Sequence, residues 1–136
     1  MRYLGIDHGL KRIGVAISDA EGMIARPLQI VSHISRAADA KRLAKIAVTQ
    51  KAEKIIVGLP TSPDGEITHQ ARTVMRFATA LGEETQAPIE YWDETNSSVR
   101  AVEISASKRK RAKGEPLDAI AAAVILQDYI DAHSPQ

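Results

Sequence analysis

Two strands joined by a tight turn are predicted by residues 3–18, YLGIDHGLKRIGVAIS. Apolar, small and β-branched residues fill Tyr3–Asp7 and Arg12–Ser18, a composition that is typical of strands. The turn between them combines a carboxylate at a strand end, a glycine and two cations, Lys11 and Arg12. This corner suits a phosphate group and a metal ion. Turns after strands also favour Asp and Gly for structural reasons alone, so its meaning depends on acidic residues further along the chain.

The rest of the chain predicts an α/β fold with one mixed sheet. A third strand, Pro27–Val31, completes an antiparallel meander with the first two. A short apolar run at Lys54–Val57 predicts a fourth strand of the buried, parallel type, and Pro88–Trp92 predicts a fifth. Apolar residues at helical spacing and a proline at a helix start predict four helices, at about 35–50, 67–81, 97–107 and 116–131. We expect one domain over residues 1–136, with helices flanking a five-stranded sheet of three antiparallel strands followed by two parallel ones.

The composition is that of a folded protein, with 44% hydrophobic and 26% charged residues. The absence of cysteine excludes disulfides, zinc knuckles, iron–sulfur clusters and thiol nucleophiles. We expect no signal peptide, because Asp7 and Lys11 interrupt the N-terminal apolar stretch. The longest apolar run, Ala119–Leu126, is far shorter than the ~20 residues of a membrane helix. We therefore expect a soluble, cytoplasmic protein. The four histidines show no metal-binding spacing and are interpreted as surface or turn residues.

The positive charge of the chain is concentrated in one stretch. The net charge is only +1, which does not predict nucleic-acid binding by the whole surface. Five cations nevertheless fall within six residues, and we interpret this stretch either as a solvated loop or as a flap that binds phosphates. The cations are Lys108, Arg109, Lys110, Arg111 and Lys113.

Three acidic positions are candidates for a catalytic site. Ligand sites in open α/β sheets lie beyond the carboxyl ends of the strands, where Asp7 ends the first strand and the pair Asp93-Glu94 ends the fifth. Asp118 lies in the first turn of the last helix, where the helix dipole alone favours an acid. It also shares an otherwise apolar stripe with Ala122, and a carboxylate on such a stripe needs a partner.

The two acids of the pair are expected to point to opposite sides of the sheet, because side chains alternate along a strand. We favour Glu94 as the ligand, since its longer side chain can cross an intervening strand, but the choice between Asp93 and Glu94 stays open. Gly58, at the end of the fourth strand, would leave room for that crossing because it has no side chain.

Convergence of Asp7, Glu94 and Asp118 would create a site for cations. Two carboxylates about 4 Å apart repel each other by roughly 4 kcal/mol at an effective dielectric constant near 20. Oxygen ligands alone favour Mg²⁺ or Mn²⁺. Two such ions about 4 Å apart bind the attacking water and the leaving oxygen of a phosphodiester, which predicts a nuclease. Lys11 or Arg12 and the basic stretch would then hold the nucleic-acid strand.

These motifs together resemble the YqgF (RuvX) family of RNase H-like proteins. The resemblance spans nearly the whole chain, in the family's order. It implies an RNase H-like fold and a metal-dependent nuclease that processes the precursor of small-subunit ribosomal RNA; the family is also discussed as a Holliday junction resolvase. By position it implies an acidic site of Asp7, the Asp93-Glu94 pair and Asp118, with Lys11 and Arg12 close to the phosphates. The motifs are Gly5–Gly9, Arg12–Ala16, Gly58–Pro60 with Asp64-Gly65, Asp93-Glu94, and Asp118 with Ala121-Ala122 and Ile125–Gln127.

The chain departs from the family pattern at one position. The family usually has an arginine after the acidic pair, whereas this chain has Thr95. Threonine lacks the bidentate donor geometry of a guanidinium, so phosphate binding there should be weaker unless Arg100, one helical turn further on, compensates. This departure bears on activity more than on fold.

Three alternatives to an rRNA nuclease remain open. A Holliday junction resolvase would have to be a dimer, because two opposed strands are cut, and the sequence does not decide between monomer and homodimer. A phosphotransferase of the actin/hexokinase kind also begins with a strand followed by Asp-x-Gly, but such proteins pair two domains of this type. An RNA-binding or ribosome-assembly factor on the same scaffold would need no catalysis.

Overall fold

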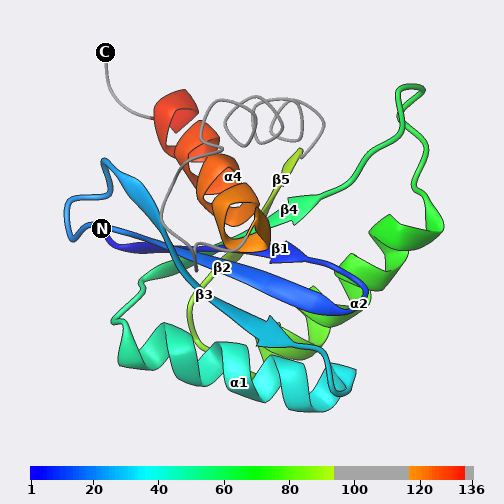
Figure 1. Ribbon diagram of the computed structural model, residues 1–136, viewed down its shortest axis with the longest axis horizontal. Coiled ribbons are helices and arrows are strands. Elements are labelled where there is room, and N and C mark those ends of the chain that lie inside the picture. Colours follow the sequence, from blue (N-terminus) through cyan, green and yellow to red (C-terminus); the bar gives the residue numbers. More distant parts are fainter. Residues whose placement is uncertain (94–116, 134–136) are drawn as a thin grey trace.

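The computed structural model describes residues 1–93 and 117–133, apart from the side chains of residues 117 and 118 (Figure 1). Its centre is a five-stranded sheet with the strand order β3-β2-β1-β4-β5. The first three strands are antiparallel, whereas β4 and β5 run parallel to β1, as predicted. The strands are β1 (Tyr3–His8), β2 (Arg12–Ser18), β3 (Ala25–Ser32), β4 (Lys54–Leu59) and β5 (Ile89–Asp93).

Three strands are longer than the sequence pattern indicated, because pairing with a neighbour extends them; β1 gains one residue, His8, which is paired with Ile13. β3 starts at Ala25 and passes through Pro27, which has no amide hydrogen to donate. The strand tolerates this proline because it lies at the sheet edge, next to a shift in register between Val15 and Ala16. β4 continues through Gly58 to Leu59, where it is paired with the end of β5.

The helices α1 (Arg36–Thr49) and α2 (His69–Glu84) begin after hydroxyl residues that cap them. The Ser35 side chain accepts a hydrogen bond from the Ala38 amide, and Thr68 accepts one from the Ala71 amide. The last helix, α4 (Leu117–His133), was predicted from the proline before it. The helix predicted at residues 97–107 lies outside the described residues. Among the described helices, none is both long enough and apolar enough to cross a lipid bilayer.

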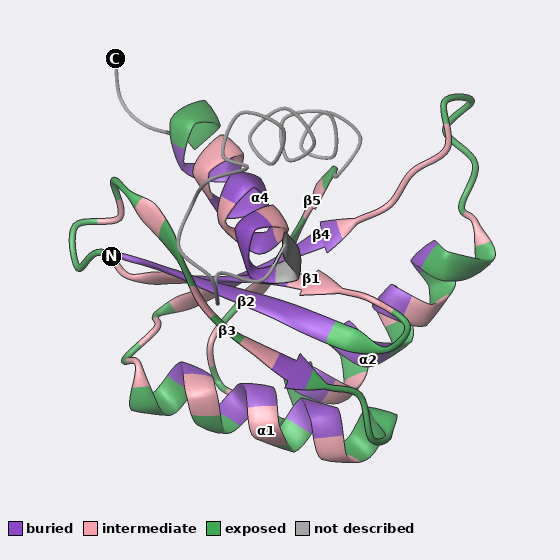
Figure 2. Ribbon diagram, in the orientation of Figure 1, coloured by how far each residue is buried: buried purple, intermediate pink, exposed green. Residues whose placement is uncertain are grey.

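Helices cover both faces of the sheet. In Figure 1, α1 and α2 lie on one face and α4 on the other. The α1/α2 face holds the larger buried core, which includes Leu4, Ile6, Leu43 and Phe77. The α4 face holds a second buried cluster (Figure 2). Side chains alternate between the two faces along a strand. A residue next to a member of the α1/α2 core therefore points to the α4 face, and a residue two positions away points to the same face as that member.

α4 crosses the sheet obliquely, with its C-terminal half over the start of β1 (Figure 1). Near its end, the Tyr129 ring meets the Tyr3 ring edge-on at 5.7 Å, and its hydroxyl lies 2.7 Å from Lys54 Nζ. In its middle the helix approaches Gly5 so closely that a Cβ there would lie 2.8 Å from Leu126 Cβ. The chain needs glycine at this position because any side chain would push the helix away. The start of α4 therefore points toward the carboxyl end of β1.

A candidate active site at the carboxyl edge of the sheet

Asp7 lies near the carboxyl end of β1, on the α4 face. It is half-buried and is paired with Gly14 of β2. Gly5, two residues earlier, faces α4, and alternation along the strand puts Asp7 on the same side. The carboxyl ends of β1, β4 and β5 share this edge because the three strands are parallel. The sequence-based position of Asp7, at a strand end beside other strand ends, is therefore correct.

Asp93 lies on the opposite face. It is the last residue of β5 and is paired with Leu59, which packs against the α1/α2 core. Its side chain is exposed, and its Oδ1 accepts a hydrogen bond of 2.8 Å from the Thr61 hydroxyl. Asp93 and Asp7 therefore do not converge. Glu94 follows directly and lies outside the described residues.

Asp118 belongs to the first turn of α4. One turn further on, the Ala122 carbonyl lies 3.2 Å from a Cβ built at Gly5. From that contact, Asp7 lies two strand residues toward the carboxyl edge, about 7 Å. Asp118 lies four residues toward the start of α4, about 6 Å along the axis of a helix that crosses the sheet obliquely (Figure 1). Both positions therefore lie on the same side of the Gly5–Ala122 contact, although they are far apart in sequence; that their carboxylates meet stays a prediction.

The described part of the chain contains no cluster of three His, Cys, Asp or Glu side chains with the geometry of a metal site. Of the three predicted ligands, only Asp7 has a described side chain. The predicted three-carboxylate cluster therefore stays a prediction.

The turn between β1 and β2 fixes the position of the two predicted phosphate-binding cations. The Gly9 amide donates to the Arg12 carbonyl, and the His33 amide donates to the Lys11 carbonyl, each at 2.9 Å. A Cβ at Gly9 would lie only 2.7 Å from the Arg12 carbonyl oxygen, so this tight turn requires glycine. Lys11 and Arg12 are both exposed. Because Ile13 belongs to the α1/α2 core, alternation puts Arg12 on the α4 face, as it does Asp7.

The remaining predicted phosphate-binding residues follow β5 in sequence. They are Arg100, Lys108, Arg109, Lys110 and Arg111, and all of them lie outside the described residues.

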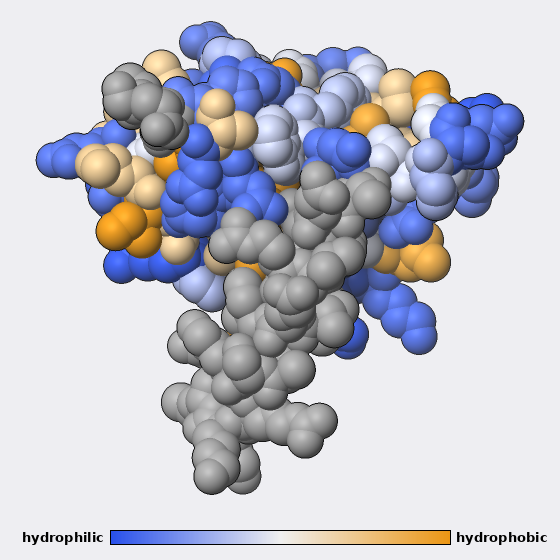
Figure 3. Space-filling view, turned by 90° about the horizontal axis from the view of Figure 1, so that it is seen from above, coloured by the Kyte–Doolittle hydropathy of each residue, from blue (hydrophilic) through white to orange (hydrophobic). Residues whose placement is uncertain are grey.

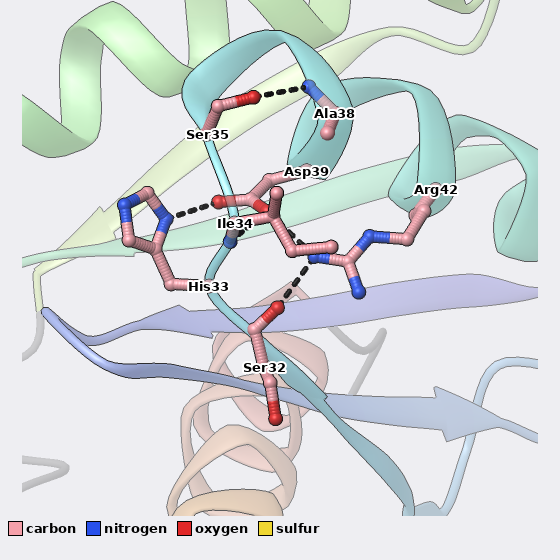
Figure 4. A network of polar contacts seen from close by, with 7 residues as sticks. All are labelled: Ser32, His33, Ile34, Ser35, Ala38, Asp39 and Arg42. Carbon is pink, nitrogen blue, oxygen red and sulfur yellow. Dashed lines mark hydrogen bonds and ion pairs between the residues drawn. The ribbon is translucent and has the colours of Figure 1, made fainter.

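A buried polar network at the β3–α1 corner was not predicted from the sequence (Figure 4). Asp39 is fully buried and accepts three hydrogen bonds. The donors are the Ile34 amide at 3.0 Å, Arg42 at 2.6 Å and His33 Nδ1 at 2.5 Å. Arg42 also donates to the Ser32 carbonyl at 2.5 Å. The network therefore stabilises the β3–α1 corner, where the His33 amide is hydrogen-bonded to the Lys11 carbonyl.

Hydrogen bonds set the charge state of this network. Burial acts to raise the pKa of the Asp39 carboxyl, but the bonds from Ile34, His33 and Arg42 together lower the pKa below its ordinary value.

His8, at the end of β1, corrects the sequence analysis: it is not a surface histidine, because its ring packs on the Phe77 ring with 4.6 Å between the ring centroids. Desolvation by burial lowers the pKa of His8.

This sheet and the three described helices belong to the class of RNase H-like folds. The structure of Thermus thermophilus RuvC in complex with Holliday junction substrate matches it with a TM-score of 0.66, covering 97% of this chain and 94% of that one at 16% identity. The fowlpox virus Holliday junction resolvase matches with a TM-score of 0.57 at 14% identity, covering 97% and 99% of the two chains. At such low identity these similarities establish the RNase H-like fold alone.

The chain belongs to the RuvX family, whose model, described as "RuvX: Holliday junction resolvase", matches residues 1–132. A protein of Thermosynechococcus vestitus named "Putative pre-16S rRNA nuclease" is 41% identical over 133 residues, covering 96% of this chain and 88% of that one. A protein of the same name from Thermoanaerobacter pseudethanolicus is 41% identical over 138 residues, covering 96% of both chains. The resemblance drawn from the motifs is thereby confirmed.

Proposed function

We propose that this protein is a divalent-metal-dependent endonuclease that cleaves the precursor of small-subunit ribosomal RNA. What most supports the proposal is the place of Asp7 in a RuvX-family fold: it lies on the α4 face near the carboxyl ends of β1, β4 and β5, and α4, which carries Asp118, packs on that face. The relatives named as pre-16S rRNA nucleases support the substrate.

Carboxylate oxygens are the donors that Mg²⁺ and Mn²⁺ prefer, so the set Asp7, Glu94 and Asp118 fits these ions. Along β5 the even-numbered residues Glu90 and Trp92 contact Tyr129 of α4. If the strand continues, Glu94 would point to the α4 face as Glu90 and Trp92 do, which favours it over Asp93 as the third ligand. When bound, the metal ions would activate the attacking water and stabilise the leaving oxygen.

The protein's own cations would orient the substrate. Arg12, on the same face as Asp7, offers two parallel donors to a phosphate, and Lys11 adds a point charge from the turn. Hydrophilic residues dominate the described surface seen from the α4 side, with apolar residues in small separate groups (Figure 3). Such a surface fits a hydrated, charged ligand. Arg100 and the stretch Lys108–Arg111 would add further phosphate contacts.

The test is cleavage of precursor ribosomal RNA in Mn²⁺ or Mg²⁺. Asp7→Asn, Glu94→Gln and Asp118→Asn should each reduce the cleavage rate by about 100-fold or more. Even the loss of a residue that only hydrogen-bonds to a metal ligand lowers metal affinity or activity by about 10–100-fold. Asp93→Asn is the matched control and should retain most of the activity, because Asp93 lies on the other face and is held by Thr61. Cleavage that survives in the Asp7 variant would refute the proposal, and an equal loss in the Asp93 variant would refute the ligand assignment.

Junction resolution is the second candidate, favoured by the description of the family model. The same assay with branched DNA separates the two functions. Symmetric cuts across a junction, together with sedimentation of the protein as a dimer on that junction, would favour the resolvase. Cleavage restricted to the RNA would favour the ribosomal substrate.

A further inference from the structure

The charges of the described chain are distributed unevenly around the sheet. Residues 25–52, which form β3 and α1 and their connections, contain six Lys and Arg but a single acid, Asp39. That acid is fully buried and bonded to Arg42. This part of the surface therefore exposes cations without exposed carboxylates, in a chain whose net charge is only +1.

The cations on α1 lie beside a groove. Lys41 and Lys45 are exposed and four residues apart, so they lie on one face of the helix. Lys45 and Arg42 line a groove of about 410 Å³ between α1 and β3. The other lining residues carry no charge: they are Gln29–Ser32, Ile46, Thr49 and Gln50.

One end of the groove lies at the β3 edge of the sheet, close to Arg12 but on the opposite face from Asp7. At one end it is lined by Ser32, which is paired with Arg12 of β2 and whose carbonyl accepts a hydrogen bond from Arg42. Because Arg12 lies on the α4 face and α1 on the other, a strand held at Arg12 reaches α1 by passing around the β3 edge of the sheet at Ser32. Arg42 is paired with the buried Asp39, so Lys45 in the groove and the exposed Lys41 one turn before it supply the positive charge that would attract an anionic ligand.

We propose that the groove between β3 and α1 binds the phosphate backbone of a substrate arm that extends beyond the cleaved bond. This inference rests on the proposed function and adds to it a substrate with a flanking arm. An acidic peptide pairing with the β3 edge is a less suitable occupant. Pro27 removes a backbone donor and Arg26 places a charge on this edge, and both features oppose strand addition.

The test is the salt dependence of RNA binding, measured without metal by fluorescence anisotropy on an RNA hairpin with single-stranded arms. The test variant is Lys41→Gln/Lys45→Gln. The matched control is Arg72→Gln/Arg76→Gln, an exposed pair with the same spacing on α2. If both lysines contact phosphates, the slope of log affinity against log salt falls by roughly 1.4–1.8 in magnitude in the test variant and stays unchanged in the control.

The two variants change exposed side chains, so both are expected to fold, and thermal melting verifies this. An unchanged slope in the lysine variant would overturn the inference, as would an equal change in both variants. A hairpin trimmed of its arms should bind both variants alike; a lysine effect that persists on it would also count against a flanking-arm groove. This experiment measures binding and no cleavage, so its outcome does not depend on the cleavage assay that tests the proposed catalysis.

Discussion

At the scale of single residues, Asp39 is the side chain on which the β3–α1 corner depends most. It is fully buried and accepts three hydrogen bonds, two of them from side chains that can carry positive charge. Asp39→Asn removes the negative charge and leaves the positive charge of Arg42 without a compensating carboxylate. We expect the free energy of unfolding to fall by about 3 kcal/mol, as for other broken buried pairs. Urea unfolding at neutral pH measures this loss, with the exposed Glu83→Gln as a control.

The pH dependence of that loss identifies the carboxylate as its cause. The pKa of Asp39 is lower in the folded state than in the unfolded chain. Its contribution to stability is therefore complete above the unfolded pKa, near 3.9, and disappears as the pH falls through the folded value. The difference between wild type and Asp39→Asn should accordingly shrink below about pH 4. A difference that stays constant down to lower pH would show that packing, not charge, is responsible.

At the residue scale, the sequence placed Asp7 correctly near a strand end, while its role as a ligand stays a prediction; it gave no sign that Asp39 is buried. Asp7 stands at a strand end, and the position of a strand end in a sheet is a local property. Asp39 stands in the first turn of a helix, where an acid is expected from the helix dipole alone. Its burial depends on His33 and Arg42 folding over it, a tertiary arrangement that spacing alone does not reveal.

At the scale of elements, local pattern located every described helix and strand, and tertiary contacts set their ends. β3 and β4 each continue past the predicted boundary because neighbouring strands supply hydrogen bonds. α2 begins at His69 rather than at Ile67, because Thr68 caps it. The placement of α4 depends on Gly5, whose role in a close helix–strand contact could not be read from a strand sequence.

Two glycine substitutions test that contact. Gly5→Ala would put a Cβ 2.8 Å from Leu126 Cβ, so α4 must move and the free energy of unfolding should fall by about 1–3 kcal/mol. Gly82→Ala, in α2, meets only Ile89 Cδ1 at an ordinary 3.7 Å. Alanine also favours the helical state, so this variant should be more stable by roughly 0.5–1 kcal/mol. Thermal and urea unfolding measure both. The same sign of change in the two proteins would contradict the close approach of α4 to β1.

At the scale of the whole molecule, sequence order was enough to predict the sheet but not its surface. The mixed sheet follows from a meander and two helical crossovers, and the observed strand order matches it. The net charge of +1 concealed a basic side formed by β3 and α1, because acids elsewhere in the chain balance it. The predicted convergence of acids from the end of β1 and the start of α4 likewise depends on how α4 crosses the sheet.

Metal binding by this edge should stabilise the entire domain. A ligand that binds only the folded state adds about 2.7 kcal/mol when its concentration is 100 times Kd. For a chain of 136 residues that corresponds to a rise in Tm of roughly 10 °C. We expect Mn²⁺ to raise the Tm of the wild type, and EDTA to reverse the rise.

The same melting experiment on variants assigns the effect to the proposed ligands. Asp7→Asn and Asp118→Asn should each lose most of the metal-dependent rise, because the ion binds worse when a carboxylate becomes an amide. Asp93→Asn should keep it, since Asp93 lies on the other face of the sheet and is bonded to Thr61. A rise of equal size in the Asp7 variant would mean that Mn²⁺ binds elsewhere on the protein. In that case, the acids at the end of β1 and the start of α4 would not form a metal site.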